Sequence, residues 1–238
     1  MKKSKFIFDV DGTLTPSRSK IDADFKTWFI DFCLTNDVYL VTGSDNSKTL
    51  EQLGEDLCYL PTRIYNCSGS EVWVKNQLIS TKQWVAPIEL VNFLNSWLVA
   101  STFCIKTGKH IEYRTSCINF SVVGRNATLG ERKLYKKWDE ETRERESIAF
   151  QINTTFEGIT ATIGGETGID IYPSGWDKGQ ILSDFNMLTD KIYFFGDNTE
   201  LGGNDYSLAS KLTNSYKVAS WKATWELLLY LKEAHIIN

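Results

Sequence analysis

Two aspartates near the start of the chain stand two residues apart, where an apolar segment gives way to a glycine. Both aspartates and this glycine lie in the octapeptide Phe8-Asp9-Val10-Asp11-Gly12-Thr13-Leu14-Thr15. Alternate residues of a β-strand point to the same side, so Asp9 and Asp11 are expected to share one small space. Crowded carboxylates need a cation or a proton between them. The pair therefore suits a hard divalent metal, or a nucleophile with a neighbouring acid, and the alternative is a β-turn with two solvated aspartates.

A second acidic strand end lies late in the chain. The apolar segment 191–195 runs into Gly196-Asp197-Asn198-Thr199, and Gly202-Gly203-Asn204-Asp205 follows it. Glycines at these positions indicate that loops follow the strand. Asp197 and Asp205 could therefore complete an oxygen-ligand metal site with Asp9 and Asp11.

Two further residues have chemistry that matches a phosphoryl group. Ser44 follows the β-branched run 38–41, and Lys178 follows Gly175-Trp176-Asp177. A hydroxyl and an ammonium are the groups needed to hold and neutralise a phosphoryl group during transfer. Taken alone, Ser44 would be a helix cap and Lys178 a solvated surface charge. Together with the aspartates, they are predicted to be catalytic.

Composition limits the class of protein. A length of 238 residues fits one to two domains, and a hydrophobic content of 42% can fill a sizeable core. The net charge of −4, without a sustained basic stripe, argues against a nucleic acid partner. No apolar run approaches the length of a membrane span, and the N-terminal Met-Lys-Lys-Ser is not followed by the apolar region of a signal peptide. The five cysteines lack C-x-x-C spacing, so a reduced, cytoplasmic protein is expected.

The elements that must position these residues alternate between strands and helices at both ends of the chain. Strands are expected over 6–10, 38–41, 64–67 and 191–195, a hairpin over 72–79, and helices over 25–34, from 48, and over 223–234. This alternation predicts an α/β fold with a doubly wound, Rossmann-like parallel sheet. The acidic strand ends would lie at the sheet edge where such folds bind ligands.

The alternation stops between about 81 and 177. This segment is expected to hold a helix over 86–99, strands over 103–105, 111–114, 118–123, 159–163 and 169–172, and a long charged helix over 129–150. It is interpreted as an inserted α+β domain, which leaves 1–80 and 178–238 as the core. The charge run 139–146 is expected to be a solvated helix face, because Glu141 and Arg145 stand four residues apart.

Three arginines of the insert are candidates for phosphate binding. Arg114 and Arg125 leave predicted strands, and Arg132 lies at the start of the long helix, where the helix dipole also favours an anion. Guanidinium groups bind phosphate through two parallel hydrogen bonds. The three could therefore hold the non-reacting end of a sugar phosphate, and the alternative is ordinary surface arginines.

The chain resembles known proteins at these same residues. The segment 8–15 is similar to the first motif of the haloacid dehalogenase superfamily, and nearly the whole chain resembles eukaryotic-type phosphomannomutases. The matching stretches are 8–18, 43–45, 51–54, 111–114, 119–125, 131–132, 164–178 and 194–205. The resemblance implies a haloacid dehalogenase core with an inserted α+β cap that recognises substrate.

The resemblance also implies residue roles. Asp9 would be the nucleophile, Asp11 the general acid and base, and Mg²⁺ would be held by the Asp9 carboxylate, the carbonyl of residue 11 and Asp197. The implied substrate contacts are Arg18, Arg114, Asn119, Arg125, Arg132 and Asp170. The implied reaction interconverts mannose 6-phosphate and mannose 1-phosphate through an aspartyl phosphate, needs a hexose 1,6-bisphosphate activator, and supplies GDP-mannose synthesis. A homodimer through the cap is expected.

Two departures from the family pattern are visible. Gly168 stands where the family has a serine that touches the substrate phosphate. Weaker phosphate binding is therefore expected, a serine at this position should tighten it, and a sugar-phosphate phosphatase is the alternative function. The segment 207–215 holds Lys211 and no acid, so the family's second, structural cation is not expected here.

Overall fold

The computed structural model describes residues 3–237 and divides into two compact units. One unit, the core unit, comprises the chain up to Thr81 together with the chain from Trp176 onward. The other, the cap unit, is Lys82–Gly175. The insert expected from the sequence was 81–177.

A seven-stranded sheet forms the centre of the core unit, in the order β11-β10-β1-β2-β3-β4-β5. The five strands from β11 to β3 run parallel, and β4 and β5 add an antiparallel edge. The predicted α/β class with a mostly parallel sheet is confirmed. The strands are β1 (Lys3–Phe8), β2 (Asp37–Val41), β3 (Arg63–Asn66), β4 (Glu71–Val74), β5 (Gln77–Thr81), β10 (Asp190–Gly196) and β11 (Asn214–Lys217).

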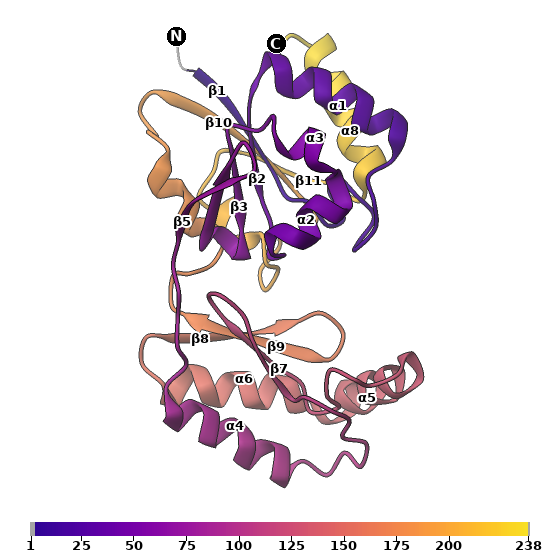
Figure 1. Cartoon of the computed structure of the whole chain (residues 1–238), viewed down its shortest axis with the longest axis vertical. Coiled ribbons are helices and arrows are strands. Elements are labelled where there is room, and N and C mark those ends of the chain that lie inside the picture. Colours follow the sequence, from indigo (N-terminus) through magenta and orange to yellow (C-terminus); the bar gives the residue numbers. More distant parts are fainter. Residues whose placement is uncertain (1–2, 238) are drawn as a thin grey trace. The chain divides into compact units, whose positions relative to one another are not determined.

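Helices cover the sheet of the core unit (Figure 1), and several of them begin at a side-chain cap. Asp22, Asp45 and Ser220 each accept a hydrogen bond from a backbone N–H of the first turn. The helices are α1 (Ala23–Thr35), α2 (Asn46–Leu53), α3 (Glu55–Cys58), α7 (Tyr206–Ala209) and α8 (Trp221–Glu233), with short 3₁₀ helices η1 (Cys67–Gly69) and η2 (Lys178–Asp184).

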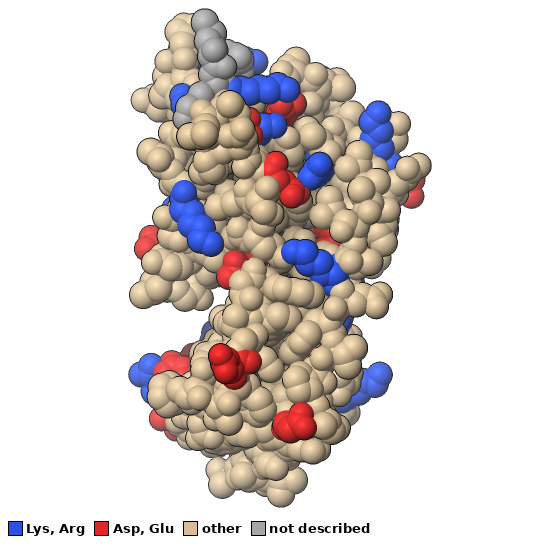
Figure 2. Space-filling model, turned by 90° about the vertical axis from the view of Figure 1, so that its left-hand side faces the viewer, with Lys and Arg blue, Asp and Glu red and all other residues tan. Residues whose placement is uncertain are grey.

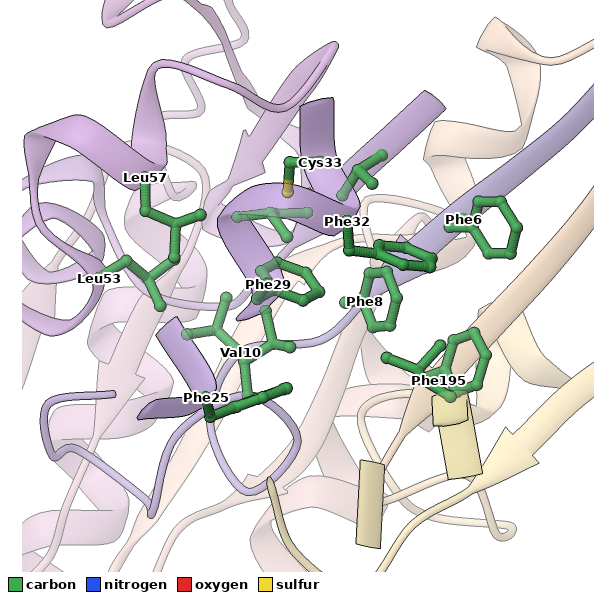
Figure 3. Packing of buried hydrophobic residues seen from close by; sticks show 14 of the residues in the cluster. Phe6, Phe8, Val10, Phe25, Phe29, Phe32, Cys33, Leu53, Leu57 and Phe195 are labelled. Atoms are coloured by element: carbon green, nitrogen blue, oxygen red, sulfur yellow. The ribbon is translucent and has the colours of Figure 1, made fainter. Parts of the chain in front are cut away.

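The residues of β1 alternate between two apolar layers. Phe6 and Phe8 pack on Phe32 of α1, with ring centroids 5.1 Å and 6.1 Å from that ring (Figure 3). Ile7 points to the opposite layer, where it clusters with Val41. Burial on both faces is typical of a central parallel strand, and it fixes the position of the strand end that carries the aspartates.

The cap unit contains an antiparallel sheet in the order β6-β7-β9-β8 and three helices. Phe120 and Ile169 of the sheet face the helices in one apolar cluster. Asn119 and Asp170, one residue away from each, point to the other face of the sheet. The elements are α4 (Ile88–Ala100), β6 (Ile111–Tyr113), β7 (Ile118–Phe120), α5 (Leu129–Thr142), α6 (Glu144–Thr155), β8 (Ile159–Gly164) and β9 (Gly168–Pro173).

The prediction of a single long helix over 129–150 is wrong. The chain forms α5 and α6 instead, and Arg143 between them has a φ of +54°, in the left-handed region that ends helices. The side chain of Asp139 accepts a hydrogen bond from the backbone N–H of Arg145 at 2.9 Å. A polar residue near the end of α5 thus caps the start of the next helix, which hydrophobic periodicity does not reveal.

The charge run 139–146 is only partly a solvated face. Asp139, Glu144 and Arg145 are buried, and Arg145 pairs with Asp139 at 2.7 Å rather than with Glu141. The break at Arg143 changes which side chains are neighbours, so the spacing expected in a continuous helix no longer applies.

Phe103–Ile105 is not a strand either. Its apolar character reflects burial of Phe103 against Tyr135, with ring centroids 5.0 Å apart. The strand expected over 118–123 is limited to β7. On the face drawn in Figure 2, basic and acidic side chains are interspersed, and neither kind forms a continuous patch. Within residues 3–237, every helix is too short or too polar to cross a bilayer.

Candidate active site

Asp9 directly follows β1 and is 2% exposed. Its N–H donates to the carbonyl of Phe195 at 2.9 Å, which continues the pairing of β1 with β10. Its Oδ1 accepts from the Nζ of Lys178 at 2.5 Å, and its Oδ2 accepts from the hydroxyl of Thr13 at 3.3 Å. The sheet thus holds a buried carboxylate against a single ammonium.

Lys178 is the first residue of η2 and is almost fully buried. Asp177 caps this helix by accepting from the N–H of Gly179 at 2.9 Å, which fixes where the lysine leaves the backbone. Its Nζ lies 2.5 Å from Asp9 and 2.6 Å from Asp205. Burial alone would lower the pKa of Lys178, but the charges of Asp205 and Asp9 outweigh burial and raise it, so the lysine stays charged.

The carboxylates around this lysine carry excess negative charge. Burial raises the pKa of Asp9 to about 7, because the lowering by Lys178 is too small to compensate, and Asp205 adds to the rise. Burial also raises the pKa of Asp197, with a further contribution from Asp205. Such raised values indicate a group of acids that a cation would stabilise.

The geometry of these acids fits a divalent cation. Oxygens of Asp9, Asp197 and Asp205 all lie within 4.8 Å of one another. Oxygen-only donor sets are typical of Mg²⁺ sites. Asp205 has both oxygens engaged, Oδ1 by Lys178 and Oδ2 by the N–H of Asn198 at 3.1 Å. The side chain of Asp11 lies outside this cluster, although the sequence placed it among the metal ligands.

Gly12 allows the two acidic strand ends to approach. Its φ of +82° lies in the left-handed region, and a Cβ at this position would collide with the carboxylate of Asp197. The glycine after the second aspartate is therefore a steric requirement of the site.

Asp11 is held by three donors from three segments. Its Oδ1 accepts from the backbone N–H of Arg18 at 2.6 Å and from the Nε2 of Gln52 at 2.9 Å. The hydroxyl of Ser44 lies 3.4 Å from its Oδ2. The structure thus brings Ser44 and Asp11 together, whereas Arg18 contributes its backbone here and is an exposed residue.

Sequence reasoning missed Gln52. It is 2% exposed on α2, and its Nε2 also lies 3.2 Å from the hydroxyl of Thr15. Its Oε1 is buried without a hydrogen-bond partner. The signal was available, because Gln52 lies between the buried face residues Thr49 and Leu53 of the helix, and a polar side chain there needs a polar partner.

In the cap unit, Glu112 joins two of the predicted arginines. Its Oε2 accepts from Arg114 at 2.8 Å and lies 3.1 Å from a terminal nitrogen of Arg125. Arg114 also lies 3.5 Å from Oδ1 of Asp170. The shared carboxylate holds the two guanidinium groups side by side, as a phosphate-binding pair requires.

Asn119 and Asp170 face each other across β7 and β9. The Nδ2 of Asn119 donates to Oδ1 of Asp170 at 2.7 Å, and Arg125 donates to Oδ1 of Asn119 at 3.4 Å. These contacts connect four of the five cap residues predicted to bind substrate, which are Arg114, Asn119, Arg125 and Asp170.

Arg132 occupies a separate place in the first turn of α5. This helix begins with a capping box between Thr128 and Glu131. The ion-pair partner of Arg132 is Glu166, 3.9 Å away, whereas Arg114 and Arg125 share Glu112. Within the cap unit, Arg132 therefore stands apart from the other four predicted residues.

The fold and the aspartate cluster define the class of protein. A haloacid dehalogenase-like hydrolase from Bacteroides thetaiotaomicron superposes with a TM-score of 0.54 at 13% identity, covering 90% of each chain. At that identity the likeness shows the fold, which is haloacid dehalogenase-like.

Residues 33–232 match the eukaryotic phosphomannomutase family, and the chain belongs to that family. It is 33% identical over 227 residues to phosphomannomutase 1 of Dictyostelium discoideum, covering 90% of each protein. It is also 33% identical over 218 residues to phosphomannomutase of Schizosaccharomyces pombe, covering 87% of this chain and 85% of that protein. The resemblance inferred from the sequence is confirmed.

Proposed function

We propose that the chain is an isomerase that interconverts mannose 6-phosphate and mannose 1-phosphate through a phosphorylated aspartate. Its family membership supports this reaction. The observation that carries the proposal is the contact between Asp9 and Lys178, at 2.5 Å inside the core unit. A buried carboxylate beside a fixed ammonium has both the nucleophile and the positive charge that phosphoryl transfer needs.

In the first half-reaction, an oxygen of Asp9 attacks the phosphorus of a hexose 1,6-bisphosphate activator. The bond from phosphorus to the sugar oxygen breaks, and that oxygen takes a proton from Asp11. Lys178 neutralises charge on the phosphoryl group during transfer, since Asp205 keeps the ammonium in place. The products are a hexose monophosphate and the aspartyl phosphate of Asp9.

In the second half-reaction, Asp11 removes the proton from a hydroxyl of the hexose monophosphate. The hydroxyl oxygen attacks the phosphorus, and the bond to Asp9 breaks. Arg18, Gln52 and Ser44 donate to the carboxylate of Asp11 and orient it for both proton transfers. The second half-reaction re-forms a bisphosphate, and when this bisphosphate reorients before it enters the first half-reaction again, the phosphate moves between C1 and C6.

A magnesium ion fits the same strand ends. Asp9 and Asp197 would hold it through carboxylate oxygens, together with the backbone carbonyl of Asp11, and Asp205 borders the same cluster. When bound, the ion supplies positive charge to the phosphoryl oxygens. The raised pKa values of Asp9 and Asp197, caused mainly by burial, support a cation here.

The cap residues would bind the part of the sugar phosphate that does not react. Arg114 and Arg125, paired through Glu112, offer a double guanidinium site for the distal phosphate. Asn119 and Asp170 offer polar groups for sugar hydroxyls, and Arg132 adds a third positive charge. Arg18 would contact substrate from the core unit.

A homodimer through the cap, in the cytoplasm, completes the proposal. The cap unit exposes large apolar side chains that a partner copy could cover, and these are Val85, Val99, Leu129, Leu134 and Phe150. No disulfide joins cysteines among residues 3–237, which fits a reducing compartment. Analytical ultracentrifugation tests the dimer, and a monomer at micromolar concentration would exclude it. The product would supply mannose 1-phosphate for GDP-mannose synthesis.

The decisive experiment incubates the protein with mannose 1-phosphate, magnesium and glucose 1,6-bisphosphate. Mannose 6-phosphate is followed by a coupled assay, and inorganic phosphate is measured in parallel. A mutase forms the sugar product with little phosphate and depends on the activator, whereas a phosphatase releases phosphate without it. Asp9→Asn should remove all turnover, because the covalent intermediate cannot form. Ordinary activity in that variant would refute the mechanism.

A further inference from the structure

The turn that directly follows β3 has an unusual backbone. Cys67, Ser68 and Gly69 form the short helix η1, and their φ angles are +48°, +57° and +97°. The left-handed region costs free energy for residues that have a Cβ, and such strain persists only where the surrounding structure holds it. Cys67 is buried, so the turn does not lie loosely on the surface. Its hydrogen bonds show what holds it in this conformation.

The turn binds the backbone of the loop that carries Ser44. The N–H of Cys67 donates to the carbonyl oxygen of Ser44 at 2.9 Å, and Nδ2 of Asn66 donates to the same oxygen at 3.2 Å. The N–H of Ser68 donates to the carbonyl oxygen of Thr42 at 2.8 Å. The left-handed backbone thus presents its N–H groups to the end of β2 and fixes the position of the loop that follows it.

The carbonyl group of Ser68 binds the helix that carries Lys178. It accepts a hydrogen bond from Nε2 of Gln180 at 2.8 Å, and Gln180 lies two residues after Lys178 in η2. Gly69 allows this approach, because a Cβ there would lie 2.7 Å from Cγ2 of Ile181 and 3.1 Å from Cγ of Gln180. Ser68 therefore connects the end of β2 with the first turn of η2.

We propose that Gln180 is a positioning residue for phosphoryl transfer, because its amide sets the distance between the Lys178 ammonium and the Ser44 hydroxyl. In the proposed reaction, Lys178 neutralises the phosphoryl group and Ser44 orients Asp11. Transfer is fast only while such groups keep their alignment. The proposal rests on the proposed function, since it requires phosphorylation of Asp9, but it does not depend on which sugar phosphate is the substrate.

The first test is Gln180→Met, which keeps the length of the side chain and removes the N–H donor. The rate at which acetyl phosphate phosphorylates Asp9 in the presence of magnesium should fall by about tenfold, because the reacting groups lose their alignment. KM for mannose 1-phosphate should change by less than about twofold, since no cap residue is altered. A phosphorylation rate equal to that of the original chain would overturn the proposal.

Arg63→Met is the matched control, because it loosens the other end of the same helix. Arg63 pairs with Asp184, the last residue of η2, at 2.6 Å. The control should leave the phosphorylation rate unchanged, whatever it does to the melting temperature, because this contact is remote in η2 from Lys178. Equal losses of rate in the two variants would show that any loosening of η2 has the same effect, and they would contradict a specific role of Gln180.

A crystal structure of the Gln180→Met variant provides a test that needs no activity. Compared with a crystal structure of the original chain, the separation of Nζ of Lys178 and Oγ of Ser44 should change by more than about 0.5 Å, the tolerance of a catalytic arrangement. An unchanged separation would overturn the proposal. If the original chain forms no phosphoenzyme at all, the proposed function fails, and this comparison still decides whether Gln180 sets the separation.

Discussion

The Nζ of Lys178 lies 2.6 Å from Oδ1 of Asp205, and both side chains are almost fully buried. The second oxygen of Asp205 accepts the N–H of Asn198. A carboxylate engaged in this way holds the lysine in place through a charge-assisted hydrogen bond. Asp197, which borders the same cluster, is only half-buried and makes no ion pair with Lys178 among the described contacts.

This difference separates the roles of two aspartates in one cluster. Asp205→Asn should lower kcat by about tenfold to a few hundredfold, because it removes a charge-assisted hydrogen bond worth about 1.5 to 3 kcal/mol. The magnesium affinity of this variant should change little. Asp197→Asn should weaken magnesium binding by at least about tenfold. Calorimetric titration with MgCl₂, combined with steady-state kinetics, checks both. Equal losses of magnesium affinity would make Asp205 a ligand instead.

The acidic strand ends could be predicted because strand periodicity and acid spacing are local. Asp9 and Asp11 follow an apolar strand, and any parallel sheet brings such an end close to that of a neighbouring strand. The contacts of the Asp11 carboxylate were not local. Gln52 reaches Asp11 across 41 positions of sequence, and only the packing of α2 on the sheet puts them together.

The cap unit was less predictable for a physical reason. The break at Arg143 depends on a side-chain cap from Asp139 and a left-handed residue, and neither disturbs the periodicity of apolar residues. The surroundings of Gly168 were equally hidden. The sequence shows a missing hydroxyl, but only the three-dimensional structure shows that the amide of Asn119 lies next to this position.

Magnesium affinity should depend on pH through Asp9. The pKa of Asp9 is raised to about 7, mainly by burial, from the usual 3.8. A cation requires the ionised form, so protons compete with it below about pH 7. The dissociation constant for magnesium should therefore rise about tenfold between about pH 8 and about pH 6. Titration calorimetry at the two values tests this, and an unchanged constant would contradict it.

The raised pKa of Asp9 also affects the folding stability of the metal-free protein. Because the pKa of Asp9 is higher in the folded chain than in the unfolded one, the folded state binds the extra proton between the two values. The free energy of unfolding should then fall as pH rises from about 4 to about 7, and magnesium should raise the melting temperature more above that window than inside it. Thermal unfolding with EDTA or with MgCl₂ measures both trends.

Gln52→Leu should separate the two half-reactions. The variant removes one donor from Asp11 and leaves Asp9 and Lys178 untouched. Phosphoenzyme should still form from acetyl phosphate. Transfer to the hexose monophosphate should slow by about tenfold or more, because Asp11 loses part of its contribution as a general acid and base. Glu51→Gln is the matched control, because Glu51 is exposed on the same helix and pairs with Lys48. Equal losses in both steps would indicate damage to the fold.

The cap arginines should matter only for substrates with a second phosphate or a sugar to hold. Arg125→Ala should lower kcat/KM for a hexose phosphate by about tenfold to a few hundredfold, because charge-assisted hydrogen bonds contribute about 1.5 to 3 kcal/mol each. Turnover of acetyl phosphate should stay nearly unchanged, since it has no distal group for the cap to bind.

Glu112→Gln tests whether the shared carboxylate holds the arginines in place for the substrate. Glu112 lies 2.8 Å from Arg114 and 3.1 Å from Arg125, so an amide would keep the shape and weaken both contacts. KM for the hexose phosphate should rise about threefold to thirtyfold, with kcat changed less, because the loss falls on binding of the part that does not react. Acetyl phosphate turnover serves again as the internal control. A lower KM would instead mean that Glu112 competes with the substrate phosphate for the two arginines.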